Sequence, residues 1–89
     1  MMHKKPIHRK ILDTYEKEMR PLLTTLPIYL EEDISLFHIK VHGLKGASRQ
    51  IGKQEIGDFA EYMELAAKDR DLEYIRQNFD YFLQKLEAL

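Results

Sequence analysis

Apolar and small side chains recur three and four residues apart along most of the chain, a spacing that places them on one face of an α-helix. The clearest stretch covers residues 34 to 51 and consists of Ile34, Phe37, Val41, Leu44, Ser48 and Ile51. The other stretches consist of Leu12, Tyr15, Met19, Leu22, Leu26 and Tyr29, of Ile56, Phe59, Met63 and Ala66 or Ala67, and of Leu72, Ile75, Phe79, Phe82, Leu86 and Leu89. No stretch shows the alternation of a β-strand, so the pattern predicts an all-α fold.

Residues that divide or end helices separate these stretches. Pro21 and Pro27 are expected to kink or divide the first one into two short helices, because proline lacks a backbone donor. Gly52 is a natural helix terminator, and Asp71 is well placed to cap the last helix. Short connections make consecutive helices antiparallel, which predicts an up-down antiparallel four-helix bundle with a short or kinked additional N-terminal helix. The bundle domain would span residues 10–89, after a basic segment at 1–9.

One histidine faces away from the apolar face of its helix. At about 100° per residue, His42 lies roughly 130° from the centre of that face and Gly46 roughly 170°. Lys45 and Gly46 follow His42 at the spacing of helical neighbours. Because a glycine within a helix costs about 0.5 to 1 kcal/mol relative to alanine, Gly43 and Gly46 require a compensating reason. Either they let another protein approach the imidazole closely, or they permit close helix packing, an alternative that stays open for Gly43.

A longer series of residues keeps a fixed register with this histidine. It comprises His42-Gly43-Leu44-Lys45-Gly46-Ala47-Ser48, Ile51-Gly52, Glu64, Ala66-Ala67-Lys68 and Asp71. The series resembles the histidine-containing phosphotransfer (HPt) domain of bacterial two-component phosphorelays, over roughly residues 10 to 89. Asp33 stands where this family usually opens its phosphoacceptor helix. Gly43, Lys53 and Arg70 depart from the family pattern, and Arg70, at a position that is often glycine, suggests a less sharp turn before the last helix.

The resemblance implies roles for individual side chains. His42 would carry a phosphoryl group between the aspartates of receiver domains, Lys45 would stabilise the phosphorylated ring, and Gly46 would leave room for the partner. Glu64 and Lys68 would support the histidine, by orienting the ring and by adding positive charge. The alternative for this pair is an ordinary surface ion pair, worth about 0.3 to 0.5 kcal/mol.

The same resemblance implies a docking face for a receiver domain. It would include Ile39, Gly43 and Arg49. Ile39 lies one turn before His42 and roughly 170° from the apolar face, so it is expected to be exposed. Burial of Ile39 under the N-terminal helix is the alternative.

Composition restricts the other possibilities. The chain has 89 residues, a net charge of -1 and no cysteine, which argues against a general nucleic-acid binder and against disulfides or thiolate metal sites. It has no ATP-binding loop and no membrane-spanning or signal segment. Together with these features, the resemblance implies a cytoplasmic, monomeric phosphoryl carrier that is not itself a kinase, either stand-alone or in cis with a membrane-anchored hybrid histidine kinase. It would need no cofactor, since the receiver supplies the magnesium.

Two further functions remain as alternatives. His38 and His42 are four residues apart and could share a cation with a nearby carboxylate, although no third ligand is obvious. A helical interaction module that has lost the relay is the other alternative, which the intact His42, Lys45 and Gly46 disfavour.

Overall fold

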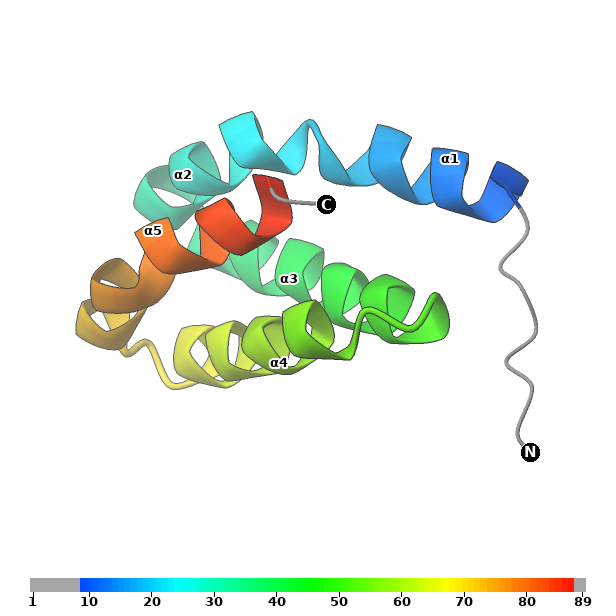
Figure 1. Cartoon of the computed structure of the whole chain (residues 1–89). Coiled ribbons are helices and arrows are strands. Elements are labelled where there is room, and N and C mark those ends of the chain that lie inside the picture. The colour runs from blue at the N-terminus through cyan, green and yellow to red at the C-terminus, as the bar shows by residue number, and fades with distance from the viewer. Residues whose placement is uncertain (1–8, 88–89) are drawn as a thin grey trace.

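The computed structural model describes residues 9–87 and contains five α-helices and no strand within that range (Figure 1). The helices are α1 (Arg9–Met19), α2 (Leu22–Glu32), α3 (Ile34–Gln50), α4 (Gln54–Lys68) and α5 (Leu72–Glu87). The all-α prediction is therefore confirmed. Residues 1–8 of the expected basic segment, and Leu89 of the last apolar stripe, lie outside the described residues. None of the five helices is long and apolar enough to cross a membrane.

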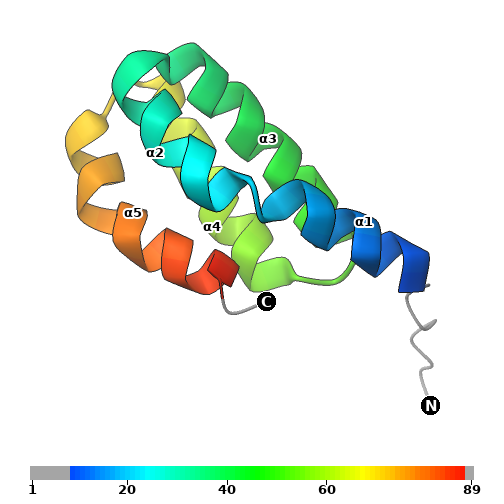
Figure 2. The same cartoon turned by 90° about the horizontal axis from the view of Figure 1, so that it is seen from above.

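The first apolar stretch forms two helices, as predicted, because the chain turns at Arg20 and Pro21. Pro21 precedes α2, and its carbonyl accepts a hydrogen bond from the backbone N–H of Thr25 at 3.0 Å. Pro27 lies inside α2 and does not end it. The two helices follow nearly the same line across the molecule, and α1 extends past the rest of the fold (Figures 1 and 2).

The other helix ends use the residues that the sequence indicates. Asp33 and Asp71 cap α3 and α5, since their Oδ1 atoms accept hydrogen bonds at 3.1 Å from the backbone N–H groups of Leu36 and Tyr74. Gly52 ends α3 in a left-handed conformation, with φ of 84°. The N–H of the next residue, Lys53, then reaches back 2.8 Å to the Ser48 carbonyl, which closes the turn into α4.

The turn between α4 and α5 has the same hydrogen bonds without a glycine. Arg70 adopts a φ of 60°, and the N–H of Asp71 donates to the Ala66 carbonyl at 2.8 Å. The expectation of a less sharp turn is therefore wrong. The arginine itself enters the left-handed region that glycine occupies more readily.

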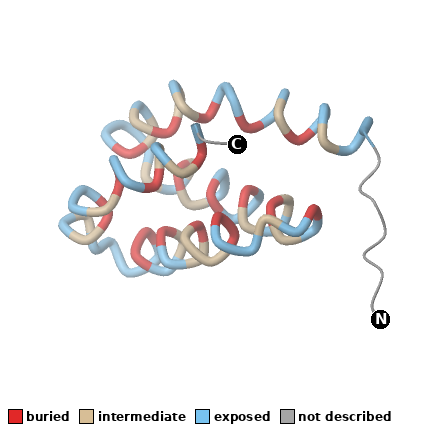
Figure 3. The backbone as a smooth tube through the Cα atoms, viewed as in Figure 1, coloured by how far each residue is buried: buried red, intermediate tan, exposed pale blue. Residues whose placement is uncertain are grey.

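The helices enclose one apolar core. α3 packs most extensively against α4, α4 packs against α5, and α2 contacts both α3 and α5 (Figure 2). Buried positions lie on the sides of the helices that face one another (Figure 3). Phe37 of α3 lies against Phe79 of α5, with ring centroids 5.8 Å apart, and Phe59 of α4 stacks on Phe82 of α5 at 5.6 Å. This packing buries the inner faces of α3 and α4 and leaves side chains on their outer faces exposed to solvent.

One polar pair is buried where α1 meets α3. The hydroxyls of Tyr15 and Ser48 are 2.7 Å apart, and both residues are almost fully buried. Burial raises the pKa of Tyr15 above its ordinary value and outweighs the opposing effect of the hydrogen bond. Ser48 therefore belongs to the inner face of α3 because its hydroxyl has a partner there.

Candidate functional site

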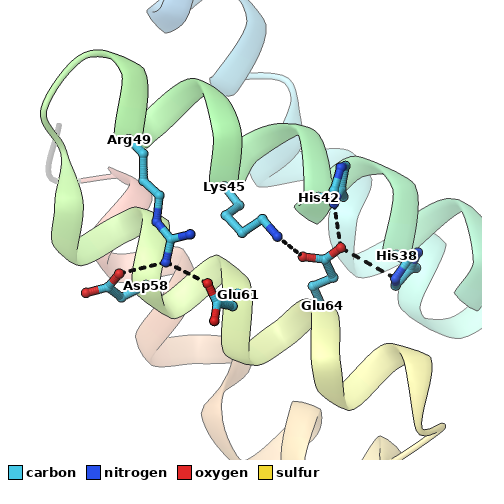
Figure 4. A network of polar contacts seen from close by, with 7 residues as sticks. All are labelled: His38, His42, Lys45, Arg49, Asp58, Glu61 and Glu64. Carbon is cyan, nitrogen blue, oxygen red and sulfur yellow. Dashed lines mark hydrogen bonds and ion pairs between the residues drawn. The ribbon is translucent and has the colours of Figure 1, made fainter.

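The imidazole of His42 lies on the outer face of α3 beside α4. Its side chain is 63% exposed, and its Nδ1 is 2.5 Å from Oε2 of Glu64 on α4 (Figure 4). An ionised carboxylate can only accept a hydrogen bond, so Nδ1 carries the proton. The lone pair of the neutral ring is then on Nε2, the nitrogen that does not contact Glu64.

The carboxylate of Glu64 joins three basic side chains of α3. Its Oε1 is 2.6 Å from Nζ of Lys45, and its Oε2 is also 3.7 Å from Nε2 of His38 (Figure 4). These three side chains lie along one edge of α3, at spacings of four and three residues, so one carboxylate from α4 reaches all of them. Only 13% of the Glu64 side chain is exposed.

Two opposing effects set the pKa of Glu64. Burial raises the pKa, while hydrogen bonds and charge interactions with Lys45 and His42 lower it, and together these place the pKa below its ordinary value. Glu64 is thus ionised at neutral pH and can bind both the ammonium of Lys45 and the Nδ1–H of His42.

The stability of the domain should consequently fall in acid. A carboxyl whose pKa is lowered by folding stabilises the native state above its unfolded pKa, and this contribution is lost as the pH falls through the folded pKa. We expect Glu64→Gln to be less stable than wild type near pH 7, and the difference to shrink as the pH drops below about 4.5. Urea unfolding from pH 3 to 7 measures it. Glu31→Gln, on an exposed ion pair with Arg76, is the control, and an equal pH dependence for both variants would contradict the assignment.

The two glycines of α3 leave open space beside the histidine. A Cβ placed on Gly43 or on Gly46 would meet no atom within 4 Å outside its own helix. Close helix packing, the alternative for Gly43, is therefore wrong. No side chain projects from either position beside His42, so another molecule can approach the ring closely.

Arg49 has a different environment from the one expected for a partner-binding residue. Its Nη2 forms ion pairs with Asp58 at 2.8 Å and Glu61 at 2.7 Å, both on α4, and its Nε is buried without a partner among residues 9–87 (Figure 4). Its hydrogen bond to Asp58 lowers the pKa of that carboxyl. Arg49 thus links α3 to α4 near the C-terminal end of α3, seven residues after His42.

The side chain of Arg49 needs Gly57 beneath it. A Cβ on Gly57 would lie 2.6 Å from Cγ of Arg49, close to the start of that side chain, where little movement is possible. We expect Gly57→Ala to lower stability by about 1 kcal/mol, because the overlap outweighs the higher helix propensity of alanine. Gly46→Ala should instead raise stability by about 0.5 to 1 kcal/mol. Thermal unfolding of both variants tests this contrast, and a stabilised Gly57→Ala would contradict it.

Ile39 is exposed one turn before His42. Its exposed fraction is 61%, so burial under the N-terminal helix, the alternative, is wrong. It borders an open groove of about 290 Å³ in which side chains of the α1–α2 segment face α3. The groove is lined by Glu18, Met19, Leu22, Ile39, Gly43 and Leu44, among others. A groove lined by apolar and small residues, with the charged Glu18 and Lys40 among them, therefore adjoins the histidine on the side of Gly43.

Lys68 is not part of the cluster around Glu64. No ion pair joins Lys68 to Glu64, since the carboxylate binds Lys45 and the histidines instead. The alternative for these two residues, a surface ion pair between Glu64 and Lys68, is therefore wrong. Lys68 lies in a second groove with His38 and Arg70.

Among residues 9–87, no group of three or more histidine, cysteine, aspartate or glutamate side chains is arranged to hold a metal ion. His38 does share a carboxylate with His42, a role that sequence reasoning did not assign to it. The available signal was its position four residues before His42, on the same edge of α3.

Comparison of the chain with protein-family models, with curated proteins and with solved structures finds no match.

Proposed function

We propose that this chain is a histidine-containing phosphotransfer domain that carries a phosphoryl group on His42 between receiver-domain aspartates. The fold proposed with this function is an up-down antiparallel bundle of α2 to α5, with α1 as the additional N-terminal helix. The domain is a stoichiometric carrier, cytoplasmic, without ATP-dependent kinase activity and without a cofactor of its own. The receiver supplies the magnesium ion.

One observation supports this proposal above the others: an exposed imidazole whose inner nitrogen is held by a carboxylate. The contact with Glu64 orients the His42 ring, while the neighbouring glycines leave its surroundings open. A histidine that only stabilised the fold would not need this exposure, and the donors around His42 within residues 9–87 are not arranged to hold a metal ion. A fixed, accessible nucleophile is what phosphoryl transfer requires.

Phosphoryl transfer to His42 forms one bond to phosphorus and breaks another. The Nε2 lone pair attacks the phosphorus of an aspartyl phosphate, the N–P bond forms, and the bond from phosphorus to the aspartate oxygen breaks. The aspartate leaves as a carboxylate, and the Nδ1 proton stays on the ring. The ring thereby gains one positive charge, which the ionised Glu64 faces at Nδ1 and stabilises electrostatically.

Lys45 influences the charge on the His42 ring indirectly, through its contact with Glu64. Its ammonium contacts the carboxylate on the Oε1 side, so it helps to keep Glu64 ionised and in place. One N–H of the ammonium donates to Glu64, and the other two remain for a phosphoryl group on His42. In the proposed mechanism Glu64 is therefore the positioning residue, and Lys45 is its partner.

The test is label transfer from a phosphorylated receiver domain to the full chain. The expected product is stable in alkali and labile in acid, as a phosphohistidine is, whereas a phosphoserine or phosphothreonine has the opposite stability. Failure of several phosphorylated receivers to label the chain would overturn the proposal and favour the interaction-module alternative.

Docking of the receiver should depend on Ile39. We expect Ile39→Asp to weaken receiver binding about tenfold or more, because the substitution places a charge on an apolar contact surface beside His42. The melting temperature should change by only a few degrees, since this side chain is 61% exposed. Binding is measured by calorimetry and melting by circular dichroism. Unchanged binding would remove Ile39 from the docking face.

A further inference from the structure

A second open groove, of about 290 Å³, lies beside His38 at the N-terminal end of α3. It is lined by Ser35, His38, Ile39, Lys68 and Arg70, which come from α3, the end of α4 and the α4–α5 turn. Two of these side chains are permanently cationic, one is a histidine and one carries a hydroxyl. The groove lining therefore contains hydrogen-bond donors and no carboxylate.

The two permanently cationic side chains of this groove are not paired with acidic side chains of residues 9–87. Lys45 and Arg49, farther along the α3–α4 contact, are each paired with carboxylates of α4. Lys68 and Arg70 form no ion pair within the described part of the chain. The two cations are therefore available to an acidic group from outside.

The backbone at Arg70 gives a second, independent reason to assign this side chain a role. Arg70 is the one residue other than glycine with a positive φ between residues 9 and 87. The hydrogen bonds that close the turn are backbone bonds that a glycine would make equally well. The side chain itself makes one hydrogen bond, from Nη1 to the Ala67 carbonyl at 3.3 Å, which leaves most of its N–H donors unused. A strained residue with unused donors suggests recognition outside the chain.

We infer that this groove binds an acidic side chain of the receiver domain that docks on His42, with Lys68 and Arg70 as the residues that recognise it. The inference rests on the proposed function, because that function supplies the partner. Ser35 and His38 can donate further hydrogen bonds to the same carboxylate. Arginine suits this task because its planar guanidinium can bind both oxygens of a carboxylate.

The position of the groove favours a docking protein as the source of the acidic group. Ile39 borders both this groove and the groove between α3 and the α1–α2 segment, and His38 lies 3.7 Å from the carboxylate that holds His42. A partner seated over the exposed ring would therefore cover both grooves at once. The charged groove would lie at the edge of that interface, where ion pairs direct association and orientation.

The experiment measures receiver binding and label transfer with the full chain at low and high salt. The variants are Lys68→Gln, Arg70→Gly and the double variant, and the probe is a phosphorylated receiver domain. Lys85→Gln is the charge-matched control, since Lys85 pairs with Glu55 near the start of α4, at the opposite end of that helix. Arg70→Gly should keep or raise the melting temperature, because glycine enters the left-handed region without strain.

We expect the double variant to raise the Kd of the receiver about 3- to 10-fold at low salt, with Lys85→Gln close to wild type. The difference should largely disappear in about 0.5 M salt, which screens exposed ion pairs. Transfer to wild type together with an unchanged Kd for the double variant would overturn this inference and leave the proposed function standing. Absence of transfer to the wild type from every receiver would overturn the proposed function, and this inference with it.

Discussion

Replacement of His42 by glutamine is expected to abolish phosphoryl transfer to the chain, with label reduced to less than about one thousandth of the wild-type level. Glutamine keeps a polar side chain of similar reach that can still donate a hydrogen bond to Glu64. It lacks a nucleophilic nitrogen, because the amide lone pair is delocalised. The measurement is the initial rate of label incorporation from a phosphorylated receiver domain.

The neighbouring histidine provides the matched comparison. His38 lies on the same helix edge and contacts the same carboxylate oxygen, but at 3.7 Å rather than 2.5 Å. His38→Gln should reach the same final labelling as wild type, at a rate within about tenfold, because the nucleophile is intact. Both variants should melt close to wild type, since each keeps Lys45 on Glu64. If His42→Gln still took up label and His38→Gln did not, the phosphoryl carrier would be His38, and the assignment to His42 would be wrong.

The helices themselves could be predicted from the sequence because their signals are local. The spacing of apolar residues along α3 gives its inner face, and capping by Asp33 or termination at Gly52 depends on residues within one turn. The exposure of Ile39 follows from the same periodicity. Each of these features is set by a few consecutive residues, whatever the rest of the chain does.

Contacts between helices could not be predicted in the same way. Sequence spacing alone made Lys68 a natural partner of Glu64, since the two are one turn apart on α4, yet the carboxylate contacts Lys45 on α3. Similarly, Arg49 was expected to face a partner, and it lies across Gly57 instead. The outcome depends on the rotation and offset of α3 against α4, which many core side chains determine together.

The left-handed backbone conformation of Arg70 could not be predicted from the local sequence either. The less sharp turn was predicted because Arg70 stands where the resembled family often has glycine, and arginine disfavours a positive φ. The packing of α4 and α5 and the caps at the turn impose the tight geometry despite that preference. Tertiary structure therefore overrides the local preference at this position, which also borders the proposed site.

Removal of the Phe37 ring should have the largest effect on stability. Phe37 is fully buried on the inner face of α3 and lies against Phe79 of α5. Phe37→Ala is expected to cost about 3 to 5 kcal/mol, because the apolar surface is lost and a cavity remains. A domain of this size is stable by about 5 to 15 kcal/mol, and each kcal/mol corresponds to about 4 to 8 °C, so melting should fall by at least 12 °C or so.

Ile39→Ala is the matched control for this substitution. Ile39 is two residues further along the same helix and is also a large apolar residue, but it is 61% exposed, so its truncation should change stability by about 0.5 kcal/mol or less. Urea unfolding gives both free energies. Similar losses for the two variants would contradict the division of α3 into a buried face and a free one. That division matters for function, because the core contacts at Phe37 hold α3 in the orientation that turns His42 outward beside Glu64.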